Sequence, residues 1–166
     1  MEAEQLKQMP LFDTLDQDEL KQVVLITRKR RFHEGQTIMR EGEQDNTMYL
    51  VLEGEVEVTK TLTMKFGEND FRETDKVLSR FRAEDQVVFG EMALIAQDTR
   101  SATVVALGEC VLLEIKRNDF LRIVERFPAM GAKLLLKISQ LLIARLRQSS
   151  QDIIRLTTAL SIALSR

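Results

Sequence analysis

The sequence contains few of the residues on which metal and redox sites depend. Its 166 residues include one cysteine, Cys110, and one histidine, His33. A single cysteine excludes a disulfide framework and a cysteine metal site. One histidine cannot supply a cluster of histidine ligands, and no Cys–His or Ser–His–Asp constellation is built around it. These absences argue against an enzyme, and we expect no cofactor and no metal ion.

Tryptophan is absent, tyrosine occurs once, and the formal net charge is −2. A nucleic-acid-binding surface normally shows a basic excess, so we do not expect nucleic acid as a partner. The N-terminus, residues 1–8, lacks the basic-then-apolar pattern of a signal sequence. No apolar run reaches the length that spans a membrane. We therefore expect a cytoplasmic protein without a membrane partner.

Proline occurs only twice, and both prolines interrupt a helical pattern. Pro10 and Asp16 punctuate two short amphipathic helices within residues 1–30. Phe127-Pro128 ends a third short helix that begins near Asn118. The helices at the N-terminus carry an apolar stripe, and we expect these residues to be packing residues.

From Arg31 the hydrophobic pattern changes from helical to alternating, and glycines separate the short apolar runs. These turn glycines are Gly35, Gly42 and Gly54. The pattern predicts an α+β protein, an antiparallel β jelly-roll barrel with short N-terminal helices and a long C-terminal helix. Residues 59–86 predict a long hairpin that turns at residues 67–70. This hairpin is either a solvated surface hairpin or a flap that contacts a partner.

A long helix is predicted from Ala129 to Arg166, interrupted only by Gly131. About 35 residues at 1.5 Å per residue give a rod on the order of 50 Å, longer than a domain of this size can bury. The helix carries two heptad series of mainly apolar residues, with Ser139 and Ser149 as two polar defects. The series are Ser139, Leu146, Ile153, Leu160 and Leu142, Ser149, Leu156, Ala163. The first turns are expected to pack on the domain, and the distal half to form a parallel homodimer. The expected division is a domain over 1–128 and a dimerisation helix over 129–166.

The most informative stretch runs from Val88 to Val105. Gly90 follows an apolar run and allows the backbone to approach a ligand, and a turn of good helix formers comes directly after it. The unpaired amides of that turn can bind an anion. Glu91 lies in this turn, and Arg100 follows nine residues later, where a guanidinium fork could close on the same anion. The pattern suits a ligand that carries both hydroxyl groups and a phosphate.

The two strings Gly90–Leu94 and Arg100–Thr103 resemble the phosphate-binding cassette of the cyclic nucleotide-binding domain family. The family includes catabolite activator proteins, regulatory subunits of cAMP-dependent kinase and cyclic-nucleotide-gated channels. The resemblance implies that Glu91 holds the ribose 2′-hydroxyl and that Arg100 pairs with the cyclic phosphate. It implies further contacts from the short helix and from the hydroxyl that follows the arginine, at Gly90, Met92, Ala93 and Ser101.

Two further serines on the long helix are candidates for contact with the base. Arg145-Leu146 followed by Ser149-Ser150 resembles the local pattern of the catabolite-activator branch, which dimerises through this helix and touches the adenine from it. That branch continues into a DNA-binding domain, whereas this sequence ends at Arg166, so we expect a sensor without one. The ligand is expected to be cAMP more than cGMP. Ser101 could accept cAMP, but its hydroxyl could also favour guanine, so cGMP stays open as an alternative. The downstream protein partner is unknown.

Two alternatives to a nucleotide sensor follow from the same residues. A metal cupin has a similar barrel but needs several histidines and a carboxylate, and this chain has only His33. A degenerate cassette could instead serve as a dimerisation or docking scaffold without ligand. Gln97 and Thr99 replace a frequent glycine and proline of the family and leave room for that hypothesis. Glu91 and Arg100 argue against it, because burying both without a ligand is costly unless they pair with each other.

Overall fold

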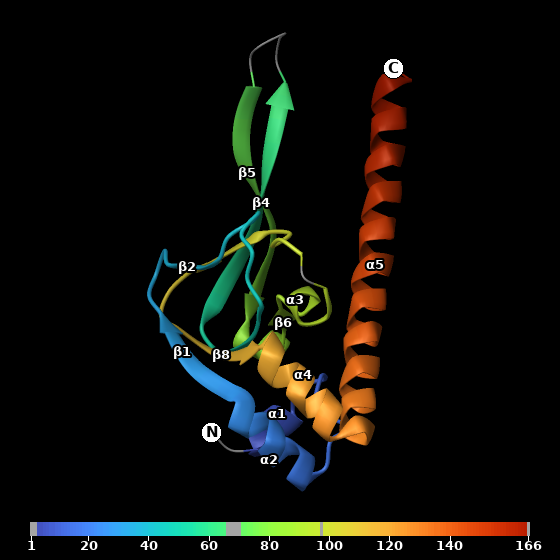
Figure 1. Cartoon of the computed structure of the whole chain (residues 1–166). Coiled ribbons are helices and arrows are strands. Elements are labelled where there is room, and N and C mark those ends of the chain that lie inside the picture. Colours follow the sequence, from blue (N-terminus) through green and yellow to red (C-terminus); the bar gives the residue numbers. More distant parts are fainter. Residues whose placement is uncertain (1–2, 66–70, 97, 166) are drawn as a thin grey trace.

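The computed structural model describes residues 3–65, 71–96 and 98–165 of the chain. Its strands form two four-stranded antiparallel sheets, with the orders β1-β8-β3-β6 and β2-β7-β4-β5. The two sheets stack as a jelly-roll sandwich, and long α5 stands to one side of it (Figure 1). The α+β jelly-roll prediction is confirmed, except that the sheets do not close into a barrel. The reason is that, among the described residues, no ladder joins an edge strand of one sheet to an edge strand of the other.

The N-terminal helices are α1 (Ala3–Lys7) and α2 (Gln17–Ile26). Asp16 caps α2, because its Oδ1 accepts hydrogen bonds from the amides of Asp18 and Glu19 at 3.0 and 2.9 Å. Glu19 Oε2 in turn accepts from the amide of Asp16 at 2.8 Å, which completes a capping box. The apolar stripe of this region is buried, as predicted, through Leu6, Leu11, Phe12, Leu15, Leu20 and Val23.

The first sheet carries the strands that the helices cover. They are β1 (Thr27–Phe32), β3 (Thr47–Glu53), β6 (Val88–Phe89) and β8 (Cys110–Lys116). The expectation that strands begin at Arg31 was wrong, since β1 begins at Thr27 and pairs with β8 over its whole length. β1 is an edge strand whose middle residues are exposed, and it therefore lacks the apolar alternation by which strands are recognised.

The second sheet contains β2 (Thr37–Met39), β7 (Thr103–Ala106), β4 (Glu55–Lys65) and β5 (Phe71–Arg82). A 3₁₀ turn, η1 (Ala83–Asp85), follows β5. The predicted long hairpin is confirmed, but its strands begin at Glu55 and end at Arg82, where the sequence predicted 59–86; β4 and β5 pair from Glu55↔Arg82 to Lys65↔Phe71 with one irregularity after Val58. Its predicted turn at residues 67–70 lies outside the described residues. The hairpin extends well beyond the rest of the sandwich (Figure 1).

Two hydrophobic clusters bury the inner strands of the first sheet, β3 and β8, on both faces. One face packs against the helices through residues such as Met48, Leu50 and Leu113. The other faces the second sheet through residues such as Val51 and Leu112. All residues of β8 except its last are buried, as expected for a strand between two layers.

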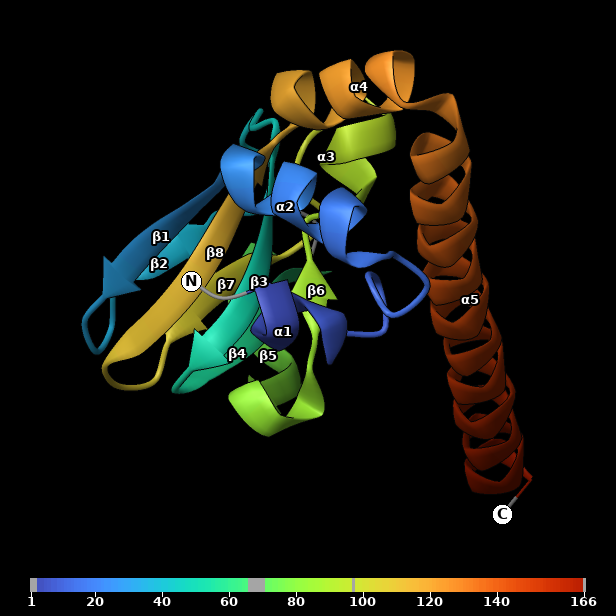
Figure 2. The ribbon, with the colours of Figure 1, turned by 90° about the horizontal axis from the view of Figure 1, so that it is seen from below.

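The C-terminal part consists of α4 (Arg117–Arg126) and α5 (Pro128–Leu164). Proline occupies the first turn of α5, where its missing amide proton costs no helical hydrogen bond. The start of α5 packs on the domain through Met130, Leu134 and Ile138, as expected for its first turns. Lys133 Nζ lies 2.8 Å from both carboxylate oxygens of Glu19, which ties α5 to α2. Beyond Ile138 no residue of α5 is fully buried, and the helix runs past the domain (Figure 2).

Candidate functional site

A cavity of about 740 Å³ lies between the second sheet, α3 (Met92–Ile95) and α5. Its apolar wall includes Val58, Phe81 and Phe89, and its polar wall includes Glu91 and Arg100. The volume falls in the range of pockets that enclose a small organic ligand. The cassette residues predicted from sequence, Gly90, Glu91, Met92, Ala93, Arg100 and Ser101, all line this cavity.

The turn between β6 and α3 shapes one end of the cavity. Gly90 has a φ of +74°, a left-handed conformation that suits glycine. Its carbonyl accepts the amide of Ala93 at 3.1 Å, and the carbonyl of Glu91 accepts the amide of Leu94 at 3.0 Å. These hydrogen bonds start a single helical turn, in which Ala93 and Leu94 are buried. The turn directs the side chain of Glu91 toward the cavity.

Glu91 is held from the long helix. Its side chain is 2% exposed, and Oε1 lies 2.6 Å from Nη1 of Arg145 on α5. The other terminal nitrogen of Arg145 donates to the carbonyl oxygen of Val88. The carboxylate is thus neutralised by a residue that is 54 positions away in the sequence. This bridge links the position of α5 directly to the cassette.

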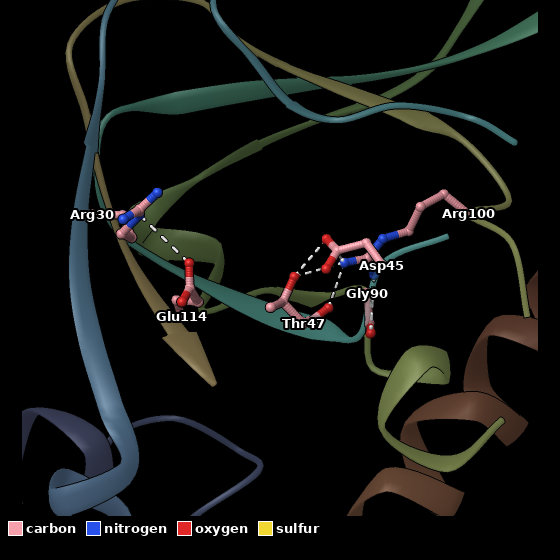
Figure 3. A network of polar contacts seen from close by, with 6 residues as sticks. All are labelled: Arg30, Asp45, Thr47, Gly90, Arg100 and Glu114. Carbon is pink, nitrogen blue, oxygen red and sulfur yellow. Dashed lines mark hydrogen bonds and ion pairs between the residues drawn. The ribbon is translucent and has the colours of Figure 1, made fainter. Parts of the chain in front are cut away.

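Arg100 is held from the β2–β3 side of the sandwich. Its side chain is 3% exposed and forms an ion pair with Asp45. Nη2 also donates to the carbonyl oxygen and to Oγ1 of Thr47, at 2.7 and 2.8 Å, and Nη1 makes a longer contact of 3.4 Å with the carbonyl of Gly90 (Figure 3). Two backbone hydrogen bonds of 2.9 Å hold the Cα of Arg100 in place. The carbonyl oxygen of Arg100 accepts from the amide of Gly42, and its amide donates to the carbonyl oxygen of Glu43.

Asp45 is charged in this arrangement. Burial opposes its ionisation, but the hydrogen bond from Thr47 Oγ1, at 2.6 Å, and the bond and charge of Arg100 outweigh burial. The pKa of Asp45 therefore lies below its ordinary value. Arg100 and Asp45 neutralise each other without any ligand.

Two buried polar atoms of the cavity have no hydrogen-bond partner. They are Nε of Arg100 and Oε2 of Glu91. Nε of Arg117 is the third such side-chain atom among the described residues, and Arg117 is not among the residues that line the cavity. A buried unpaired donor or acceptor is costly, so each atom points to a missing partner. A ligand with an anionic group near Arg100 and a hydroxyl near Glu91 would satisfy both.

The remaining predicted contacts are distributed around the cavity. Ser149 lines it from α5, whereas Ser150 does not, and the hydroxyl of Ser150 donates to the carbonyl of Leu146 at 2.9 Å. Contact of either serine with a base stays a prediction. Thr99 also lines the cavity, and Gln97 lies outside the described residues.

Sequence reasoning missed the residues that hold the cassette. Asp45 and Thr47 were not singled out, because nothing in their spacing links them to an arginine 53 to 55 residues later. Arg145 was noted only as part of a local pattern. Its position four residues before Ser149 places both on one face of α5, a signal that could have identified it. The argument against the ligand-free scaffold assumed that buried Glu91 and Arg100 could be neutralised without a ligand only by each other, but each has its own ion-pair partner.

Across residues 3–65, 71–96 and 98–165 there is no group of three or more His, Cys, Asp or Glu side chains that could hold a metal ion. Within those ranges, no helix has both the length and the apolar character needed to cross a membrane.

Comparison with known proteins gives this arrangement a family. The family model of the cyclic nucleotide-binding domain matches residues 29–127. The Cyclic AMP receptor protein of Thermus thermophilus is 27% identical over 148 residues, which cover 89% of this chain and 62% of that protein. A cyclic nucleotide-gated potassium channel of Rhizobium etli is 35% identical over 113 residues, 68% of this chain and 27% of the channel. The crystal structure of the Thermus thermophilus Catabolite Activator Protein matches with a TM-score of 0.73 and 27% identity, over 89% of this chain and 63% of that one.

The chain belongs to the cyclic nucleotide-binding domain family, as its cassette predicted. It is a regulatory domain of the cyclic nucleotide-binding type, a class distinct from the metal cupins. The chain spans 62% of the length of the Thermus receptor and 27% of that of the channel.

Proposed function

We propose that this chain binds a cyclic nucleotide, cAMP in preference to cGMP, in the cavity between the sandwich and α5, and signals through α5. The observation that carries the proposal is the pair of unpartnered buried atoms, Arg100 Nε and Glu91 Oε2, on one cavity wall. A cyclic phosphate accepts hydrogen bonds from a guanidinium, and a ribose hydroxyl donates to a carboxylate. The preference for cAMP is supported by the name of the Thermus relative, a cyclic AMP receptor.

The binding proposal is tested by isothermal titration of the purified chain, freed of co-purified nucleotide, with cAMP, cGMP and 5′-AMP. We expect a dissociation constant of about 10 µM or tighter for cAMP, corresponding to roughly 7 kcal/mol. 5′-AMP is the matched control, since it carries the same base and ribose but no cyclic phosphate. Equal affinity for 5′-AMP and cAMP would show that the cavity does not select a cyclic nucleotide. Absence of heat with both cyclic nucleotides would favour the ligand-free scaffold.

We propose that the distal half of α5 pairs with the same helix of a second copy. Large apolar residues there are exposed, including Leu146, Ile153, Leu156 and Leu160, each between 59 and 68%. Within the described residues, nothing in a single copy buries this stripe, although Ile153 and Leu156 also border the cavity. Parallel pairing of the two helices would bury both heptad series. A change at the cavity would then reach the dimer interface through α5.

The dimer is tested by sedimentation equilibrium of the chain and of the double variant Leu146→Glu, Leu160→Glu. Neither residue lines the cavity, so nucleotide binding should persist. We expect the unsubstituted chain to sediment as a dimer at micromolar concentration and the variant as a monomer. Arg147→Glu, an exposed site on the same helix outside both heptad series, is the control and should leave the dimer intact. A monomeric unsubstituted chain would contradict this part of the proposal.

Arg145 is expected to couple the ligand to the helix, and Arg145→Gln should loosen α5. Loss of the guanidinium leaves the buried Glu91 carboxylate without its partner and removes the bond to Val88. We expect the free energy of unfolding to fall by about 1–3 kcal/mol. Amide hydrogen exchange in α5 near Arg145 should rise in the ligand-free chain and be suppressed again by cAMP. Arg147→Gln is the matched control, and equal exchange in both variants would exclude this role for Arg145.

A further inference from the structure

The densest positive charge of the molecule lies on β1, away from the cavity. Arg28, Lys29, Arg30 and Arg31 follow one another there, and no acidic residue occurs from Thr27 to His33. All four are exposed. Because the whole chain has a net charge of −2, this cluster is local and does not reflect a basic protein.

The backbone of this strand has a free edge. β1 is the outermost strand of its sheet, and within the described part of the chain it pairs with β8 alone. In both overall views β1 and α5 lie on opposite sides of the domain (Figures 1 and 2). One edge of β1 thus presents peptide groups that no strand pairs with among the described residues. A second copy of β1 would meet four positive charges, so the charges oppose self-pairing at this edge.

The positive charge on this edge is only partly neutralised. Arg30 lies 3.5 Å from the carboxylate of Glu114 (Figure 3), and Lys29 lies 3.9 Å from that of Glu53. Arg28 and Arg31 have no ion-pair partner among the described residues. Their two charges are therefore available to a partner that carries carboxylates.

A groove of about 350 Å³ continues from the start of β1 between α2 and α4. Its walls combine the apolar side chains of Leu25 and Phe127 with the guanidinium groups of Arg28, Arg122 and Arg126. The apolar stripe of α2 is buried, but Leu25, near the end of that helix, lies outside the stripe and is 77% exposed. Such exposure is unusual for a leucine. Arg126 stacks 5.5 Å from the ring centroid of Phe127, and Arg122 pairs with Asp119.

We propose that the free edge of β1 and this groove form a docking surface for an acidic, extended segment of a partner protein. The segment adds a strand beside β1, its carboxylates face Arg28 and Arg31, and one apolar residue enters the groove at Leu25. Main-chain hydrogen bonds supply affinity in this mode of recognition, and side-chain pockets supply specificity. An acidic protein segment fits better than nucleic acid, because an unpaired strand edge and an exposed leucine match a peptide backbone and an apolar side chain. The surface lies outside the nucleotide cavity, so it does not depend on the proposed function.

The test uses the full chain and a fluorescent ten-residue peptide of threonines with glutamates three residues apart, which therefore reach both faces of the added strand, and with leucine at its end. Two matched peptides serve as controls, one with glutamine for every glutamate and one with methylated backbone amides. Fluorescence anisotropy is measured with the chain, with Arg28→Glu, Arg31→Glu, and with a control double variant, Lys76→Glu, Arg147→Glu. Both control sites are exposed and lie on the hairpin and α5. Because the two double variants have equal net charge, they separate a local surface from an overall charge effect. Thermal unfolding confirms that each variant is folded.

The acidic peptide should bind in the micromolar range, and Arg28→Glu, Arg31→Glu should weaken it at least tenfold, with little effect from the control variant. The glutamine and methylated peptides should each bind at least tenfold more weakly. No binding of the acidic peptide, or equal loss in the two double variants, would overturn the proposal. A single-stranded oligothymidine of similar length that binds more tightly than the peptide would assign the surface to nucleic acid instead.

Discussion

Arg100→Gln is expected to weaken cAMP binding by about 10- to 100-fold, the effect of losing a charge-assisted hydrogen-bonding group worth roughly 1.5–3 kcal/mol. Among the described residues, Arg100 is the one positively charged side chain that lines the cavity and is also almost fully buried. Within the described part of the chain its Nε has no partner, and its Nη1 has only the 3.4 Å contact to the carbonyl of Gly90. The Nε–H group can therefore donate to a phosphate oxygen. Isothermal titration at constant ionic strength measures the loss.

Asp45→Asn separates the role of Arg100 in binding from its role in structure. Both substitutions break the same ion pair, but Asp45→Asn leaves the guanidinium in place and removes the carboxylate that competes with a phosphate for it. We therefore expect Asp45→Asn to bind cAMP as tightly as the unsubstituted chain or more tightly. If Arg100→Gln and Asp45→Asn lose the same amount of cAMP affinity, then Arg100 contributes to binding only through its ion pair with Asp45. Arg100→Gln that binds within twofold of the unsubstituted chain would remove Arg100 from the ligand site.

The sequence predicted which residues share the site better than it predicted how they are held there. Glu91 and Arg100 were assigned to one cavity because a turn after an apolar run and an arginine before a strand carry a recognisable local pattern. Their partners come from the β2–β3 region and from α5. Those contacts depend on how the two sheets stack and on where the long helix lies, and neither is encoded in local spacing.

The helices and strands also divide into those that a local pattern predicted and those that depend on distant contacts. The hairpin of β4 and β5 and the helix α5 have strong periodic patterns, and both were predicted. β1 was not, since four basic residues on an edge strand show no alternation, and its identity rests on pairing with β8. The closure of the barrel was predicted from strand spacing alone. Spacing does not determine whether the edge strands of two sheets pair, and in the described part of the chain they do not.

Gly90→Ala is expected to disrupt both the fold of the cassette and the ligand site. A Cβ atom at this position would lie 2.5 Å from Nη1 of Arg100 and 2.8 Å from the carbonyl oxygen of Thr47. The first neighbour could move, but it is the group expected to bind phosphate, and the second is backbone. The left-handed φ of +74° adds strain of about 1–2 kcal/mol for any residue with a Cβ. We expect a loss of stability larger than that strain alone and at least a tenfold loss of cAMP affinity.

Gly42→Ala isolates the contribution of backbone strain to this result. Gly42 has a similar φ of +81°, but nothing lies within 4 Å of a Cβ built on it. Chemical denaturation should therefore show a loss of about 1–2 kcal/mol for Gly42→Ala, the strain of the left-handed conformation alone, with little change in nucleotide affinity. The difference between the two variants measures the collision with Arg100 and Thr47. If both variants lose the same stability and both retain affinity, then Arg100 is not confined by Gly90, and the cassette tolerates a side chain where the structure shows no space for one.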